Sequence, residues 1–484
     1  MNISKSSKLI EHIKSVILVV LLIKTILLLY FLWGGTLLQT ETRGNEPLHV
    51  AIDPTLIFQP DRFEISLGGG THTVTTDTSE KFALFMSCFR TFSVGRNLVV
   101  REIPGGILIH NEIKRRESIT AVFEYFLPMS VLVELYGLDR IQGADSIETI
   151  SELTHVFGLD ESLFVFDRKS GSAFLIEGTR TECFAMLRQA ATDITLPQKT
   201  YVPITALAGI QNNTLWPLAP VSNIHDVSFF REDIFAQESE VQSLVKGFFG
   251  GTLDFVRRIA EPNGTKKYIY GYGEEVVIVH PSGRLEYIRA VSSTNRRNTA
   301  IGYLEAFEVA NSFIAAHGGF STLAGLQLAP HLKEVLPISK NGQNGFRFVL
   351  GVKIEGVTIH YQRGEAMVID VLPSGVSYFK RYLINVDLSE VIASQRGYRQ
   401  VFFPILNLIA HNEEYVRDSL IRQKRMDELD SLDFLFTNVT HLSSGYVKIY
   451  EIENVLKAAW ILTIAGVDFY FGIESGQPLG YRVR

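Results

Sequence analysis

Apolar residues dominate one early segment, Val16 to Leu38, which contains 23 residues and a single charge at Lys24. At 1.5 Å per residue a helix of that length measures roughly 35 Å, and a bilayer core is about 30 Å thick. Three lysines and one glutamate precede this segment, whereas two acids and one arginine follow it closely. Because positive residues favour the cytoplasmic side, we expect a cytoplasmic N-terminus (1–15), a transmembrane anchor (16–38) and the bulk of the chain outside the cell membrane.

A cleaved signal peptide is the alternative, with a short apolar core from Thr25 to Leu32. The segment Gly34 to Leu38 lacks the small-x-small pattern of a cleavage site, which favours the anchor. Lys24 has two interpretations that stay open. Its stem can reach back to the headgroups, or it can contact an acidic or polar partner on another membrane helix. It is our candidate residue for a membrane partner contact.

Beyond the anchor, short runs of alternating character and turn residues predict an α+β domain over 45–200. A glycine turn at Gly68 to Gly70 separates two strand-like runs, which predicts a β-hairpin rather than a phosphate-binding loop. The other expected elements are helices over 79–92 and 182–192, paired strands over 98–109, an apolar run over 123–136 broken at Pro128, and a hairpin over 163–177.

Proline-rich sequence from Leu196 to Pro220 predicts an irregular connection to a middle α+β domain over 221–298. That domain opens with a helix candidate from Val241 to Ile259, which three glycines weaken. Three strands are expected to follow, over 268–272, 275–280 and 285–291.

The last region, 299–484, begins with a helix over 299–317, where Tyr303, Phe307, Ala310 and Ile314 form one apolar stripe. Gly318-Gly319 is typical of a helix end. Strands are expected over 346–354, 357–361, 366–372 and 376–383.

A weak internal repeat connects two parts of this region. Val352 to Tyr361 parallels Leu462 to Phe471, and each segment contains a Gly-Val step and precedes a Ser-Gly turn. One interpretation is a duplicated helix-plus-sheet unit, with halves over 299–385 and 386–484. The other is that two unrelated hairpins share a common turn.

Composition narrows the class of protein. The 484 residues are 46% hydrophobic and 20% charged, which is globular, and the net charge of -6 gives no reason to expect nucleic-acid binding. Two cysteines, Cys88 and Cys183, are too few for a disulfide scaffold. We favour small buried thiols over a single bridge between them, although the sequence leaves both open.

Signatures of catalysis are missing from the sequence, which has no H-E-x-x-H, C-x-x-C, P-loop or G-x-S-x-G. The histidines are scattered, so we expect no metal site and no cofactor. Adjacent strand residues such as Glu274 and Glu275 point to opposite faces and do not make a carboxylate pair. We therefore predict a protein that is not an enzyme, although triads assembled from distant residues leave no sequence signature.

Several short motifs resemble the YycH family of extracytoplasmic regulators of the WalK (YycG) sensor kinase. The similar stretches are Ile13 to Val20, Gly69-Gly-Thr-His-Thr-Val-Thr-Thr-Asp77 before a helix, and Tyr270-Gly-Tyr-Gly-Glu-Glu-Val-Val-Ile-Val279 running into Gly283 to Ile288. The ending from Lys457-Ala-Ala-Trp460 through Phe469-Tyr-Phe471 resembles the terminal sheet of YycI and PepSY-type domains.

The resemblance implies an α+β protein with an N-terminal transmembrane helix and several extracytoplasmic domains of antiparallel sheets with packed helices. It also implies contacts with a sensor histidine kinase of a two-component system, a YycI-like partner and membrane lipid. Such a protein modulates the kinase through membrane and outer-domain contacts. Two alternatives remain: a PepSY-like cell-envelope inhibitor or chaperone, and an envelope hydrolase with dispersed catalytic residues.

Overall fold

In the computed structural model of this chain, residues Ala51–Arg484 belong to one of two units. The structure describes residue 24 and residues 51–66, 68, 70, 72–76, 79–93, 98–138, 141–159, 162–177, 189, 200–218, 224–228, 238–291, 299–321, 328–383, 386, 402–427, 430–449 and 455–484. These residues form an α+β fold dominated by antiparallel and mixed sheets. Within these ranges, no helix combines the length and the apolar character that crossing a bilayer requires.

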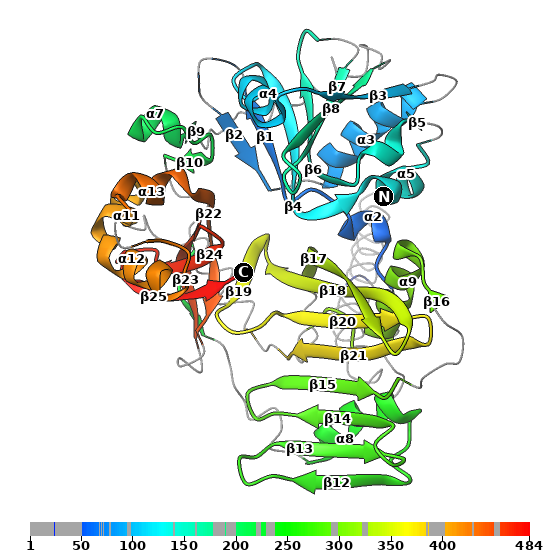
Figure 1. The fold of residues 1–484 in the computed structure, drawn as a ribbon. Coiled ribbons are helices and arrows are strands. Elements are labelled where there is room, and N and C mark those ends of the chain that lie inside the picture. Colours follow the sequence, from blue (N-terminus) through cyan, green and yellow to red (C-terminus); the bar gives the residue numbers. More distant parts are fainter. Residues whose placement is uncertain are drawn as a thin grey trace, which may run out of the picture. The chain divides into compact units, whose positions relative to one another are not determined.

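The first sheet has the strand order β10-β9-β2-β1-β4-β6-β7-β8-β3-β5 (Figure 1). Its strands are β1 (Arg62–Ser66), β2 (His72–Thr75), β3 (Leu98–Ile103), β4 (Ser118–Pro128), β5 (Ile141–Gln142), β6 (Thr149–Val156), β7 (Ser162–Asp167), β8 (Ser172–Glu177), β9 (Thr200–Pro203) and β10 (Leu215–Pro217). The helices along this stretch are α2 (Pro54–Ile57), α3 (Ser79–Ser93), α4 (Gly106–Ile113), α5 (Met129–Tyr136), η2 (Ala144–Ser146) and α7 (Ile204–Ala208).

Most predicted elements of this region are confirmed. The glycine hairpin pairs β1 with β2, the helix over 79–92 is α3, and β7 pairs with β8. The apolar run is β4 followed by α5, with the break at Pro128.

Two predictions here are wrong. The second strand expected within 98–109 is the helix α4, because a short apolar run fits either element and Gly105, at φ 85°, starts a helix instead. The expected irregular connection contains β9, α7 and β10, and β9 pairs with β2.

The second sheet follows the order β12-β13-β14-β15-β21-β20-β18-β19-β22-β23-β24-β25, with β11, β16 and β17 paired beside this path. Its strands are β11 (Val227–Ser228), β12 (Val256–Ala260), β13 (Lys266–Tyr270), β14 (Glu275–Val279), β15 (Arg284–Arg289), β16 (Thr299–Ala300), β17 (Ala329–Lys340), β18 (Gln343–Ile354), β19 (Val357–Tyr361), β20 (Met367–Leu372), β21 (Gly375–Tyr382), β22 (Val439–Lys448), β23 (Val455–Ile464), β24 (Val467–Gly472) and β25 (Pro478–Val483). The helices are α8 (Glu238–Lys246), η3 (Gly247–Phe249), α9 (Tyr303–Ala316), η4 (Ile405–Asn407), α11 (Leu408–His411), α12 (Glu413–Arg422) and α13 (Leu432–Thr437).

The seven strands predicted between 268 and 383 are confirmed as β13, β14, β15, β18, β19, β20 and β21. The helix over 299–317 is α9, which buries Phe307, Ala310 and Ile314 against the sheet. The helix over 241–259 is wrong beyond Lys246, since the glycines end it and residues from Val256 onward form β12.

Strand β17 has no counterpart among the predicted elements. Its twelve residues contain Pro330 and Pro337, and proline is rare in the middle of a sheet because it cannot donate a ladder hydrogen bond. Among the described strands β17 pairs with β18 alone, in a ladder with a bulge after Leu332, and prolines are tolerated in a strand paired along one edge.

The two segments of the weak repeat form matching hairpins. Glu355 and Ala465 both adopt φ 48°, and each precedes a glycine at φ 77°. Positive φ at both central residues matches the right-handed twist of the flanking strands. The turn conformation is therefore the same, but a shared turn is also what two unrelated hairpins would show. The proposed domain boundaries and the duplicated halves remain predictions.

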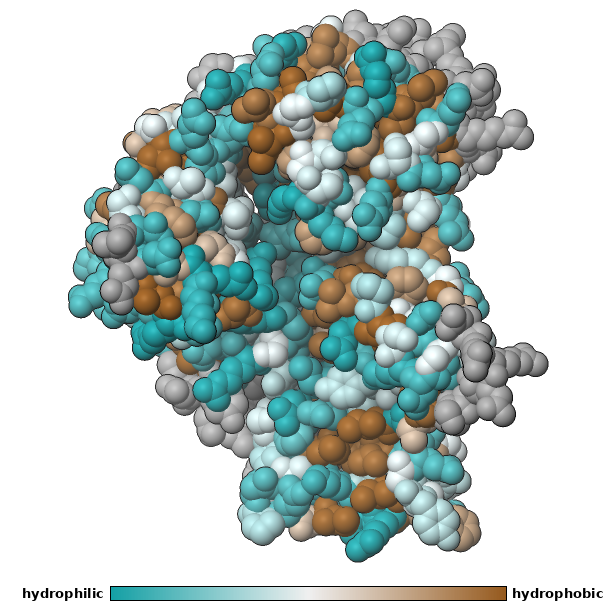
Figure 2. Space-filling model, viewed as in Figure 1, coloured by the Kyte–Doolittle hydropathy of each residue, from teal (hydrophilic) through white to brown (hydrophobic). Residues whose placement is uncertain are grey.

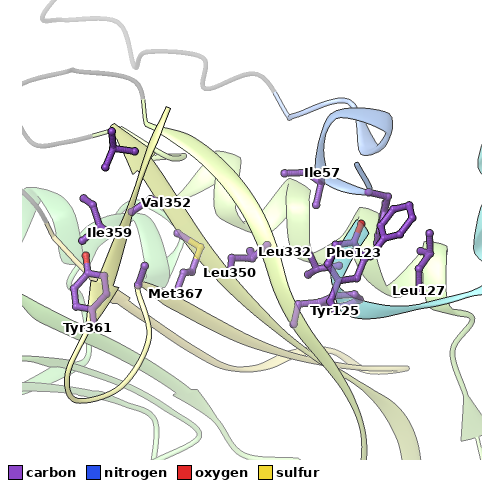
Figure 3. Packing of buried hydrophobic residues seen from close by; sticks show 14 of the residues in the cluster. Ile57, Phe123, Tyr125, Leu127, Leu332, Leu350, Val352, Ile359, Tyr361 and Met367 are labelled. Atoms are coloured by element: carbon purple, nitrogen blue, oxygen red, sulfur yellow. The ribbon is translucent and has the colours of Figure 1, made fainter. Parts of the chain in front are cut away.

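A hydrophobic core continues from the first sheet into the second. Strand β4 contacts β17, and buried side chains from both belong to one cluster. Figure 3 shows Tyr125 and Phe123 close to Leu332, which lies beside Leu350. The start of the described unit is held in place as well, because the main chain of Ile52 forms two hydrogen bonds with the side chain of Asn311 on α9.

Three sequence predictions concern residues that the structure describes little or not at all. The anchor segment and the helix over 182–192 lie outside the described residues, apart from Lys24 and Gln189. Lys24 has helical backbone and an exposed side chain, so its membrane contact stays a prediction. Cys88 is buried as expected, but it is disulfide-bonded, which corrects the expectation of a free thiol. Cys183 lies outside the described residues.

Candidate functional site

A polar cleft of about 500 Å³ lies between the two sheets. Its lining comes from β1, β2, β4, β6 and α4 on one side, from β17, β18, β19 and β22 on the other, and from the segment between α7 and β10. Figure 2 shows hydrophilic residues gathered around the hollow at this place. The described lining residues contain five carboxylates, five lysine or arginine side chains and four histidines.

In the wall from the first sheet, the polar side chains occupy alternate positions of their strands and therefore share one face. Arg62 and Glu64 lie on one face of β1, and the register places Glu152 of β6 on the same face across β4. Helix α4 covers this face and contributes His110, and Lys114 follows directly after the end of the helix. His110 stacks on Phe166 with ring centroids 4.0 Å apart.

Lys114 is the centre of a buried ionic network in this wall. Its ammonium forms ion pairs with Glu64 and, at 2.9 Å, with Glu152. His110 Nε2 lies within hydrogen-bond distance of Glu152, at 2.9 Å. Arg62 Nε forms an ion pair with Glu64 at 3.0 Å. These carboxylates are therefore satisfied within the protein.

The pKa values of the network follow from these contacts. Burial favours the neutral form of Glu64, but Lys114 and Arg62 outweigh it and lower its pKa to about 2. Burial opposes the charge of Lys114 as well, yet Glu152 and Glu64 raise its pKa. Glu64, Glu152 and Lys114 are therefore all charged at neutral pH.

The opposite wall carries basic side chains on one face of the second sheet. His331 and Lys333 project from β17, Lys353 from β18 and His360 from β19. Burial lowers the pKa of His331 and His360 well below the usual value, so both rings are neutral at pH 7. The Nδ1 of His331 is buried without a hydrogen-bond partner among the described residues.

Asp61 stands at the junction of the walls. Its Oδ2 accepts the main-chain N–H of Glu124 at 2.6 Å. Burial, with the nearby charge of Glu124, raises the pKa of Asp61 to about 7, against the opposing attraction of Lys353. Asp61 thus titrates in the physiological range.

A relay of polar contacts crosses the cleft from the first sheet to the second. His441 Nδ1 on β22 lies 3.2 Å from Glu124 Oε1 on β4, and His441 Nε2 lies 2.9 Å from Ser443 Oγ. The carboxylate accepts, so we assign the proton to Nδ1 and let Ser443 donate to Nε2. Burial lowers the pKa of His441 to about 4, so this is a neutral imidazole at pH 7.

The relay resembles the acid–base–nucleophile order of a hydrolytic triad. His441 and Ser443 are two residues apart on one strand, which places both side chains on the same face. A base with a pKa near 4 is poorly matched to neutral pH, because it accepts a proton from a hydroxyl only weakly.

The segment between α7 and β10 closes one side of the cleft. Asn212 Nδ2 donates to the carbonyl oxygens of Phe436 and Val439, at 2.7 and 2.8 Å, and Thr214 Oγ1 donates to Val439 at 2.9 Å. These contacts tie the last strands of the first sheet to the start of β22.

No group of three metal-binding side chains is arranged to hold an ion within the described part of the chain. The groups that line the cleft can form hydrogen bonds and ion pairs, and Asp61 can exchange a proton near neutral pH.

The sequence missed the cleft almost entirely. The sequence singled out no residue of the cleft as a candidate for function, and the candidate Lys24 is not among its lining residues. The detectable signal was polar residues at alternate positions of otherwise buried strands, such as Lys353 in β18 and His360 in β19. Nothing in the sequence indicated which strands would face each other.

No family model and no curated protein matches the sequence. Solved structures similar to this chain include YycH from Bacillus subtilis, with a TM-score of 0.49, 9% identity, and coverage of 89% of this chain and 98% of that one. An uncharacterized protein from Eubacterium rectale ATCC 33656 has a TM-score of 0.34 and 10% identity, and the match covers 56% of this chain and 91% of that one. The C-terminal domain of Bacillus megaterium YpeB has a TM-score of 0.24 and 11% identity, covering 51% and 97%.

Proposed function

We propose that this chain is a single-pass membrane protein whose folded region lies outside the cell and modulates a sensor histidine kinase of a two-component system. The apolar segment Val16 to Leu38 serves as the anchor, with the N-terminus in the cytoplasm. A YycI-like protein and membrane lipid are the further partners. The sequence motifs that resemble the YycH family support this assignment.

The observation that carries the proposal is the fastening of Ile52 to α9. Asn311 Oδ1 accepts the main-chain N–H of Ile52 at 3.1 Å, and Asn311 Nδ2 donates to the carbonyl oxygen of Ile52 at 2.6 Å. Asn311 is buried, and Ile52 is fourteen residues beyond the end of the apolar segment. A change in the folded region can reach an anchor only through a connection that is stiff at this end.

The test measures kinase output in cells that carry the full-length chain, through a transcriptional reporter of the response regulator. Asn311→Ala and a six-residue Gly-Ser insertion between Pro47 and Leu48 should both alter the output several-fold at equal protein level. Ser312→Ala, on the exposed face of the same helix, is the matched control and should leave the output unchanged.

Two results would count against the proposal. Deleting the whole chain without any effect on kinase output would remove the regulatory role. A normal output from both altered chains would retain regulation but reject the stiff connection as its route.

A second candidate function is hydrolysis, which the relay of Glu124, His441 and Ser443 favours. A fluorophosphonate probe distinguishes the two, since an activated serine attacks its phosphorus, expels fluoride and becomes phosphonylated. Because His441 has a pKa of about 4, we expect no labelling of the wild-type chain at pH 7. Labelling that disappears in Ser443→Ala, with His441→Ala behaving alike, would instead establish the hydrolase.

A further inference from the structure

One pair of opposite charges in the cleft is not satisfied by the protein. The carboxylate of Asp61 and the ammonium of Lys353 attract each other, yet no ion pair joins them in the described part of the chain. Among the described residues, the carboxylate of Asp61 accepts one hydrogen bond, from the main-chain N–H of Glu124. By contrast, Lys333 is paired at 2.9 Å with Glu365, which also pairs with Arg482.

His331 adds an unused polar atom beside this pair. Its ring lies against the main chain of Gly351, where a Cβ atom would stand 2.2 Å from His331 Cε1. Gly351 and Lys353 are two residues apart on β18 and so share one face of the sheet. The buried Nδ1 of His331 therefore lies on the face that carries the Lys353 side chain, without a partner among the described residues. A buried polar atom of this kind costs free energy unless a ligand or water satisfies it.

The charge balance and the size of the cleft restrict the ligand. A lone anion would face Asp61 and Glu124, and a lone cation would face Lys353, so either would meet a like charge. A zwitterion satisfies both sides at once. The volume of about 500 Å³ lies within the range of small-molecule sites, and Val74, Leu215 and Val357 supply apolar surface in the lining.

We infer that the cleft binds a small zwitterion of the amino-acid or short-peptide type, with its ammonium at Asp61 and its carboxylate at Lys353 and His331. This binding requires neither an anchor nor a kinase. Its failure would therefore leave the proposed function standing, and failure of the proposed function would leave the site.

The test is calorimetric titration of the purified full-length chain with alanine, Ala-Ala and Ala-Ala-Ala, and with the N-acetylated and C-amidated forms of each. At least one uncapped probe should bind, and either cap should weaken it about tenfold or more, as expected for the loss of one buried charged contact. Absence of binding by every uncapped probe up to about 10 mM, a concentration far above the affinity of a specific site, would overturn the inference. Equal affinity for capped and uncapped probes would overturn it as well.

Two substitutions assign the ends of the ligand. In Asp61→Asn the protein should no longer distinguish the free amine from its acetylated form, and in Lys353→Met it should no longer distinguish the carboxylate from its amide. Lys169→Met is the control, because that lysine is 57% exposed, pairs with Glu148 and does not line the cleft. Thermal melting of each variant verifies folding.

A third variant gives an independent result if the two charge variants fail to fold. Thr358→Phe, at a partly exposed lining position of β19, fills the cleft without removing a charge and should abolish binding. Wild-type affinity in folded Thr358→Phe, or in both charge variants, would place the ligand elsewhere and reject the site.

Discussion

His441 Nδ1 on β22 lies 3.2 Å from Glu124 Oε1 on β4, so this close polar contact joins residues that are 317 positions apart and belong to different sheets. Glu124 is held further by Arg62 at 3.5 Å, and its main-chain N–H is bound by Asp61. Although burial opposes ionisation of Glu124, His441 and Arg62 lower its pKa. The contact therefore leaves a charged carboxylate at the junction of the two sheets.

Removing this contact should destabilise the junction. In His441→Ala the carboxylate of Glu124, whose side chain is 30% exposed, loses the imidazole that lies 3.2 Å from it and is itself 14% exposed, which we expect to lower the free energy of unfolding by about 1–3 kcal/mol. Urea denaturation measures the change. His225→Ala is the control, because His225 is 31% exposed, its partner Glu474 is 59% exposed, and such pairs contribute about 0–1 kcal/mol. Equal effects of the two substitutions would show that the bridge contributes no more than a surface pair.

Lys114 should be among the most sensitive positions of the first sheet. Lys114→Met removes the cation that pairs with Glu64 and Glu152 and leaves both carboxylates buried. Breaking a buried ion pair in this way lowers the free energy of unfolding by about 3–5 kcal/mol. The neighbouring Arg116→Met breaks an exposed pair with Glu112 and should cost under about 0.5 kcal/mol. Chemical denaturation of both variants provides the comparison, and a Lys114→Met protein as stable as Arg116→Met would contradict the network.

The raised pKa of Asp61 predicts an unusual pH dependence of the protein's stability. Its pKa is raised in the folded state to about 7, so the folded protein binds a proton more tightly than the unfolded chain between about pH 4 and 7. This group's contribution to stability is therefore lost as pH rises through that window. Asp61→Asn stays neutral, so its stability relative to wild type should increase from pH 5 to pH 8 by on the order of 3 kcal/mol. Denaturation at the two pH values tests this, and a pH-independent difference would contradict the raised pKa.

Glu64 should act in the opposite direction. Its pKa is lowered to about 2, so its stabilising contribution is present above the unfolded value of 4.5 and is lost as pH falls toward 2. Glu64→Gln should therefore reduce stability strongly at pH 6, by about 3 kcal/mol, and much less near pH 2.5. A loss of equal size at both pH values would indicate packing rather than charge.

Cys88 predicts a simple chemical result. Alkylation of the denatured, unreduced chain should modify neither cysteine, and prior reduction should expose both cysteines of the sequence. Mass spectrometry counts the adducts. Cys88→Ser should lower the free energy of unfolding by about 2–4 kcal/mol, the usual contribution of a native bridge. Modification without reduction would contradict the disulfide.

The sequence by itself determined much of the local structure of this protein. Alternation and turn residues predicted the hairpin of β1 and β2 and the strands from β13 to β21, because these depend on side-chain period and turn chemistry over a few residues. The apolar stripe of α9 was equally local. Where one short run suited two structures, as at Gly106 in α4, the sequence could not decide between them.

Only the tertiary structure decided the cleft and its chemistry. Asp61, Lys353 and His441 are far apart in the chain, and each alone looks like an ordinary polar residue in a strand or loop. The pKa values of Asp61 and His441 arise from burial and from neighbours supplied by another sheet. Electrostatic effects of this kind depend on distance and desolvation rather than on residue order, so no local pattern records them.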